Sequence, residues 1–202
     1  MESQNIIVEL RKLIKNFEDE LQSGTLRKKV LALIPCFHQL RVLGSSLLPS
    51  DCKESARARI LHYLKKYSKI VISGDELLVV SGIQDYPRRI RELRKEFGWS
   101  VVSGKTAKEM ADEDNLSIKG VDILSMDTSD YILLSVKQDR DAAHRWFLAN
   151  DIRRSKLSAR NKLLKFFKQN IGKEVTGEEL RYVAKDSTEW ARRVRELRTE
   201  YG

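Results

Sequence analysis

Apolar residues recur at helical spacing through residues 3–48. Separations of three and four place such residues on one side of a helix, and the pattern occurs twice in succession. It predicts a helical hairpin, in an N-terminal region that we place at residues 1–50. Pro35 falls inside the second helix, where we expect an irregularity, because proline lacks the backbone N–H that a helix uses. The positions that define the pattern are Ile6, Leu10, Leu13, Ile14, Phe17 and Leu21, then Val30, Ile34, Phe37 and Leu40.

The rest of the chain contains one segment twice. Residues 55–98 align with residues 158–202 when one extra residue is allowed in the second copy, and 17 of the 44 aligned positions are identical. Many of the differing positions keep their character, as where Tyr86 aligns with Trp190. Similarity of this extent indicates two copies of one structural unit.

Each copy predicts three helices. The first has apolar residues at helical spacing, the second is short, and the third is basic and ends at Gly98 or Gly202, where a helix C-cap glycine is expected. Two helices joined by a short turn, the second of them basic, form a helix-turn-helix. The short helix opens in each copy with a capping box, in which a hydroxyl and a carboxylate accept from backbone N–H groups: Ser73-x-x-Glu76 and Thr176-x-x-Glu179.

Two β-rich segments follow the first copy. Residues 99–102 and 131–134 predict the paired strands of a β-wing, and the long insertion at 103–130 has room for a short extra helix in its KTAKEMADE run. The expected fold is mainly α with small β-wings (α+β), namely two tandem winged helix-turn-helix units preceded by the helical hairpin. We place the first unit at 51–135, a connecting helix at 136–156, and the second unit at 157–202. The second copy stops where its own wing should begin, so we expect the chain to be cut inside a repeat unit.

The third helix of each copy separates an apolar stripe from a basic side. The stripe must pack on the other two helices, and long hydrogen-bond donors on the other side suit the major groove of DNA. Arginine suits this role because its planar fork binds a phosphate or a guanine edge with two hydrogen bonds. We expect double-stranded DNA as the partner, with these contact residues: Gln84, Arg88, Arg89, Arg91, Arg94, Lys95 and Lys105 in the first unit, and Thr188, Arg192, Arg193, Arg195, Arg198 and Thr199 in the second.

Charge and composition agree with a DNA partner and offer no catalytic chemistry. The net charge of +9 attracts polyanions. Three scattered histidines, two cysteines without a CxxC spacing, and no phosphate-binding glycine loop predict no catalytic residue, no metal site and no cofactor. The cysteine usage favours a reducing cytoplasm, and we expect no contact with a membrane because every long apolar stretch is interrupted by charges.

The two copies also resemble a known family. The segments GDELLVVSGIQDYPRRIRELRKEFGW and GEELRYVAKDSTEWARRVRELRTEYG are similar to the winged-helix regions that precede the nuclease domain in a family of bacterial HNH restriction endonucleases, and LALIPCFHQLRVLGSSLLP resembles that family's N-terminus. The resemblance implies a target-recognition module of a restriction-type HNH endonuclease, whose nuclease domain is not in this chain. The insertion at 103–130 departs from the family pattern.

Several alternatives remain open at this stage. The basic helices suit solvated surfaces stabilised by ion pairs between neighbouring turns, and tandem winged helices also serve as protein-interaction or transcription-regulatory modules. A self-contained enzyme is a third hypothesis. Trp99 and Trp190 suit either core packing or a pocket for a modified or flipped base. The hairpin suits either a brace for the first unit or a homodimer interface.

Overall fold

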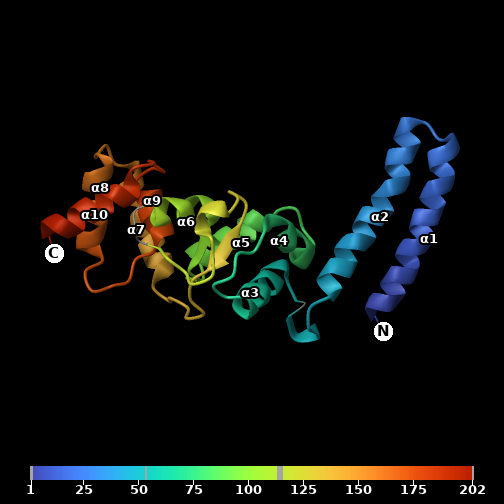
Figure 1. The fold of residues 1–202 in the computed structure, drawn as a ribbon, viewed down its shortest axis with the longest axis horizontal. Helices are drawn as coiled ribbons and strands as arrows, with labels where there is room; N and C mark the ends of the chain where they lie inside the picture. The colour runs from blue at the N-terminus through green and yellow to red at the C-terminus, as the bar shows by residue number, and fades with distance from the viewer. Residues whose placement is uncertain (1, 53, 113–115, 202) are drawn as a thin grey trace. The chain divides into compact units, whose positions relative to one another are not determined.

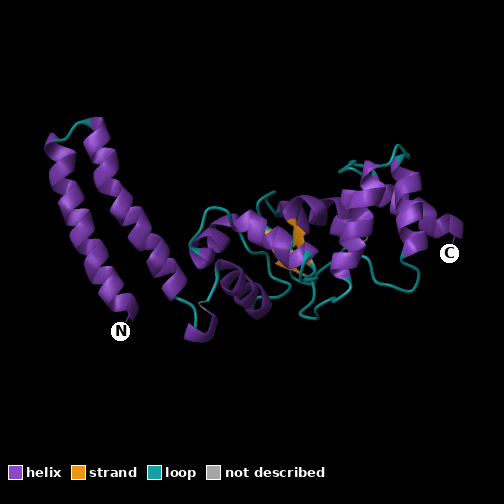
Figure 2. Ribbon diagram, turned by 180° about the vertical axis from the view of Figure 1, so that it is seen from behind, coloured by secondary structure: helices purple, strands orange, loops and turns teal. Residues whose placement is uncertain are grey.

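The structure is a computed structural model that describes residues 2–52, 54–112 and 116–201. It is mainly helical, with one small two-stranded antiparallel sheet (Figures 1 and 2). Contacts divide the chain into two units: residues 1–63 with 75–89, and residues 64–74 with 90–202. The first copy of the repeat contributes to both units, whereas the second copy lies wholly in the second. No helix in the described ranges combines the length and the apolar character that crossing a membrane requires.

The predicted hairpin consists of α1 (Glu2–Ser23) and α2 (Leu26–Ser46), which pack along each other. Thr25 caps α2, its side chain accepting from the backbone N–H of Lys28, and so restarts the helix directly after the turn. The irregularity expected at Pro35 does not end α2, which continues through it. The hairpin is therefore two unbroken helices of about equal length.

The last turns of α2 are anchored on α4 (Gly74–Ser81) within the first unit. The Nε of Arg41 donates to the carbonyl of Gly82 over 2.6 Å. A Cβ on Gly44 would lie 2.5 Å from the carbonyl oxygen of Val79, so only glycine allows this approach. The hairpin thus braces the first copy at this end, one of the two roles that its sequence suggested.

The first copy continues with helix α3 (Ala56–Lys66), α4 and α5 (Tyr86–Lys95). The 3-10 turn η1 (Ser50–Cys52) precedes it. Gly98 follows α5 with φ +68°, the left-handed conformation of a C-cap glycine. Its predicted counterpart, Gly202, lies outside the described residues.

Strands β1 (Val101–Ser103) and β2 (Tyr131–Leu133) pair antiparallel, Val102 opposite Ile132. The insertion between them contains α6 (Gly104–Ala111) and the turn η2 (Ile123–Ser125), which close a small apolar core over Val102 and Ile132. The predicted strands and the extra helix in the KTAKEMADE run are confirmed. The last residue of that run, Glu113, lies outside the described residues.

The connecting segment and the second copy form the main core of the second unit. Helix α7 (Ala142–Arg154) lies in the segment where a connecting helix was predicted, followed by α8 (Ala159–Gln169), α9 (Gly177–Val183) and α10 (Trp190–Tyr201). Helices α8, α9 and α10 pack pairwise, as the repeat predicted. The capping box at Thr176 and Glu179 is formed in both directions. The residue boundaries placed at 50, 135 and 156 stay predictions.

Replacing Phe166 by alanine tests this core. Phe166 on α8 is fully buried, whereas Phe147 on α7 is 70% exposed. Phe166→Ala should lower the free energy of unfolding by about 3–5 kcal/mol, because it removes transfer energy and leaves a cavity. Phe147→Ala is the matched control and should change it by about 0.5 kcal/mol or less. Urea denaturation followed by circular dichroism measures both, and equal losses would contradict the described core.

Candidate nucleic-acid interface

Helix α5 divides its side chains as the sequence predicted along most of its length. Ile90 and Leu93 are buried, while Arg88 and Arg91, three residues apart, are exposed on the helix surface. Arg89 is half-buried. Gln84 is exposed in the turn before the helix. This part of α5 therefore presents guanidinium groups to solvent above an apolar side.

Helix α10 repeats the arrangement in the second copy. Trp190, Val194 and Leu197 are buried. Arg193 and Glu196 on its polar side are half-buried. The other predicted contact residues are exposed: Thr188 just before the helix, then Arg192, Arg195, Arg198 and Thr199. The predicted division into a buried and a basic side holds for this helix.

Acidic side chains restrain two of the arginines on α10. Arg192 reaches Glu189 and Glu196 at 3.3 Å each, and Arg193 contacts Glu196 at 2.7 Å. The hydrogen bond from Arg193 lowers the pKa of Glu196, so this carboxylate stays ionised near neutrality. Exposed pairs of this kind contribute little to stability, because water and salt screen them. A polyanion can therefore compete for these arginines at small cost.

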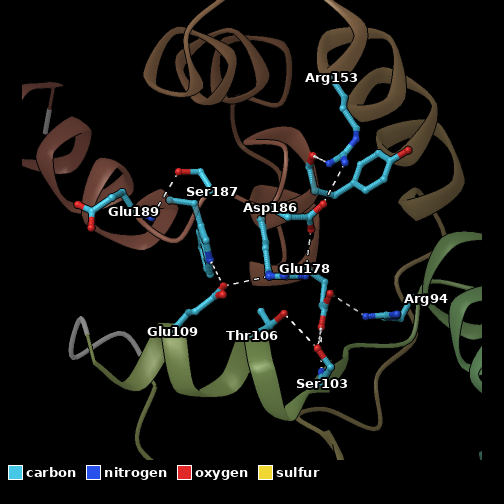
Figure 3. A network of polar contacts seen from close by, with 12 residues as sticks. Arg94, Ser103, Thr106, Glu109, Arg153, Glu178, Asp186, Ser187 and Glu189 are labelled. Atoms are coloured by element: carbon cyan, nitrogen blue, oxygen red, sulfur yellow. Dashed lines mark hydrogen bonds and ion pairs between the residues drawn. The ribbon is translucent and has the colours of Figure 1, made fainter. Parts of the chain in front are cut away.

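The last turn of α5 departs from the prediction. The side chain of Arg94 is only 17% exposed, and its Nη1 lies 2.7 Å from Oε2 of Glu178 on α9 (Figure 3). The ammonium of Lys95 lies 4.1 Å from the ring centroid of Tyr182 and 4.7 Å from that of Trp146, distances typical of cation–π contacts. Lys95 was expected to point outward and does not, because α7 and α9 cover this end of α5.

Glu178 is the centre of the contacts around that turn. Besides Arg94, its carboxylate accepts from the backbone N–H and the hydroxyl of Ser103, both at 2.8 Å. Ser103 ends β1 and precedes α6, so one carboxylate joins three elements of the chain (Figure 3). Glu178 itself is buried. Its contacts link the end of the first copy to the short helix of the second.

A second carboxylate adds a parallel link from α6. Glu109 accepts from Nε of Arg181 at 3.0 Å and from the indole N–H of Trp190 at 2.5 Å (Figure 3). Trp190 is buried, as is Trp99. Both rings therefore serve core packing, and the alternative of a base-binding pocket lined by them finds no support.

An internal salt bridge joins α7 to α9 and was not predicted from the sequence. Arg145 of α7 is buried, with its Nε 2.9 Å from Oε1 of the equally buried Glu179, and it also pairs with Asp139. Burial works against charge on Arg145, but the two acids raise the pKa of its guanidinium overall. For Glu179 burial prevails and raises the pKa of the carboxyl. The sequence does place this arginine inside an otherwise apolar and aromatic stretch (AAHRWFLA), which is a sign of a buried charge. It does not indicate which acidic residue pairs with it.

The remaining candidates add little chemistry. Lys105 is exposed at the start of α6. Within the described ranges, no group of three or more histidine, cysteine or acidic side chains is arranged to hold a metal ion. Cys52 lies 2.9 Å from Nδ1 of His62, but desolvation raises the pKa of this thiol, whereas a nucleophilic cysteine needs a lowered one.

Replacing Glu178 by glutamine tests the link between the copies. The amide keeps the shape but loses the charge, so Arg94 is left buried without its counterion. The free energy of unfolding should fall by about 3 kcal/mol, the lower end of the range for breaking a buried pair. Glu174→Gln, at an exposed position before α9, is the matched control and should leave it unchanged. Thermal or urea unfolding measures both, and a fall equal to that of the control would refute the link.

Comparison with protein families relates most of the chain to restriction enzymes. A family model described as the KpnI N-terminal domain matches residues 57–134 and 160–202, more than half of the chain. The two matched ranges begin at equivalent positions of the repeat, Arg57 and Arg160. No curated protein and no solved structure matches the chain. The chain belongs to the family of the KpnI N-terminal domain.

Proposed function

We propose that this chain binds double-stranded DNA and recognises a target on it as part of a restriction-type HNH endonuclease. The observation that carries the proposal is the pair of exposed arginine sets at equivalent positions of α5 and α10. Membership of the KpnI N-terminal domain family supports the connection with restriction enzymes. In this proposal the chain delivers the enzyme to its site, and the nuclease chemistry belongs to another part of the parent protein.

The proposed arrangement is a pair of winged helix-turn-helix units. Helix α5 is preceded by a short helix and followed by β1 and β2, the order of elements in a winged helix. Helix α10 follows the short α9 in the same way. In such units the third helix enters the major groove and the wing lies near the backbone. Gln84 and Thr188, which precede the two helices, and Lys105 beyond β1 are then placed for contacts with phosphates or bases.

The exposed arginines can contact either the phosphates or the bases of DNA. Phosphate contacts supply most of the affinity, while a fork directed at guanine reads sequence. Arg88, Arg91, Arg192 and Arg195 are the proposed central contacts, with the exposed Arg198 and Thr199 beside them and the half-buried Arg89 and Arg193 on the flanks. We leave Arg94 and Lys95 out of the contact set because Glu178 and two aromatic rings hold their head groups.

Recognition of sequence is favoured over recognition of a modified base. A flipped base needs an accessible stacking pocket, and the two tryptophans that suggested one are buried. A protein-interaction role is favoured for one part alone, the N-terminal hairpin, where large apolar side chains lie exposed. We therefore assign DNA to the repeats and a protein partner to the hairpin.

Replacing the central arginines tests the proposal. Arg88→Ala with Arg91→Ala, and separately Arg192→Ala with Arg195→Ala, should each weaken binding to a randomised duplex by about 100-fold, because removing one arginine from a DNA interface costs roughly 1–3 kcal/mol. Fluorescence anisotropy at low salt measures the dissociation constant. The slope of log K against log salt should become shallower by about 0.9 for every phosphate that is no longer neutralised.

The control removes equal charge elsewhere. Arg140→Ala with Arg154→Ala takes two exposed arginines from the loop before α7 and from its end. This variant should bind within about threefold of the unmodified chain, since a general decrease in positive charge acts only through screened, long-range attraction. Unchanged affinity in both test pairs, or an equal weakening in the control, would refute the assignment of α5 and α10.

A further inference from the structure

The N-terminal hairpin buries few of its apolar residues. Packing of α1 on α2 encloses Ile6, Leu10 and Cys36, each at most 9% exposed. Many other large apolar side chains of the hairpin are exposed. Six of them, each 37–60% exposed, are Ile7, Ile14 and Leu21 on α1, and Val30, Phe37 and Leu40 on α2. We call these six residues the apolar hairpin face. A pair of helices that exposes this much apolar surface has an unusually small core for its length.

The six residues share one side of the hairpin. On α1, Ile7 follows the buried Ile6 by one position, which is a rotation of about 100° around the helix. On α2, Phe37 follows the buried Cys36 in the same sense. Both helices are right-handed and run antiparallel, so equal rotations from their mutual contact turn both stripes to the same side. The seven-residue spacing from Ile7 to Ile14 to Leu21, and from Val30 to Phe37, keeps each stripe aligned along its helix.

The size and charge of this face suit association with another apolar helical surface. Helix α1 has 22 residues, which makes it about 33 Å long, and two helices side by side are about 20 Å wide. Two such faces would bury about 1,300 Å², within the range of roughly 1,200–2,000 Å² of stable interfaces. Residues 2–46 carry seven basic and five acidic side chains, so +2 of the total charge of +9 lies here. Repulsion between two copies is therefore weak.

We infer that the hairpins of two copies of this chain pack face to face and form a four-helix bundle. Heptad-spaced apolar stripes are covered in bundles by helices with the same period. A second copy supplies two such helices of matching length, and a two-fold axis lets the same face serve both partners. The anchoring of α2 on α4 through Arg41 and Gly44 then ties the dimer to the first repeat copy.

The dimer extends the proposed function without depending on it. If the repeats bind DNA, two-fold symmetry presents two identical recognition modules, which suits a target with the same symmetry. The association itself requires no DNA. Its test therefore gives the same result whether or not the arginines of α5 and α10 bind a duplex.

The test is the mass of the full chain in solution, measured by size-exclusion chromatography with light scattering at about micromolar concentration. We expect twice the chain mass of 23.4 kDa. Val30→Glu with Phe37→Glu should raise the dimer dissociation constant by at least about 100-fold, because the bundle would bury unpaired carboxylates. Leu31→Glu with Val42→Glu is the matched control. These two residues are 52% and 48% exposed on another side of α2, and the control should remain dimeric.

A mixing experiment separates loss of association from loss of folding. The Val30→Glu, Phe37→Glu chain is mixed with a Val30→Lys, Phe37→Lys chain, and opposite charges on the two faces should restore a two-chain species. A single-chain mass for the unmodified protein would overturn the proposal. So would a control that dissociates as readily as the test variant, or a mixture that stays monomeric although circular dichroism shows both variants helical.

Discussion

Two adjacent carboxylates at the start of α9, those of Glu178 and Glu179, are buried in the second unit. The packing of this unit depends on the cations and hydrogen-bond donors that neutralise them. Glu179 closes the capping box and pairs with Arg145, while Glu178 pairs with Arg94 and accepts from Ser103. A helix as short as α9 has little stability of its own. Acids in its first turn are favoured by the helix dipole, and their cationic partners come from α5 and α7. Satisfying these charges therefore fixes α9 against the elements that precede it.

This compensation divides the arginines of α5 between two tasks. The last turn of the helix is used for anchorage, because Arg94 and Lys95 are held by Glu178 and by the rings of Trp146 and Tyr182. Arg91 and Arg88, about one and two turns earlier, keep their exposure. Glu109 joins α6 to both α9 and α10. The insertion after β1 is thus part of the scaffold that orients α9 and α10.

The hairpin obeys a different constraint. Its helices meet along a narrow seam whose buried apolar residues are Ile6, Leu10 and Cys36, so they enclose little apolar volume. Other large apolar residues lie beside that seam. In the second unit, by contrast, α7 to α10 enclose Phe166, Trp190 and their neighbours without another chain. The two regions therefore differ in where their apolar surface can be buried.

The sequence by itself determined the helical hairpin, the two copies, the capping box at Thr176 and the C-cap at Gly98, because these depend on local spacing and local backbone preferences. It also determined that α5 and α10 each have a buried and a basic side. Which basic residues remain accessible was decided only by the tertiary structure. Lys95 has the spacing of an outward residue, yet α7 and α9 cover it, and the pairing of Arg145 with Glu179 joins positions 34 residues apart. Helical periodicity specifies the direction in which a side chain leaves its helix. The residue that it contacts depends on which distant segment the folded chain places in that direction.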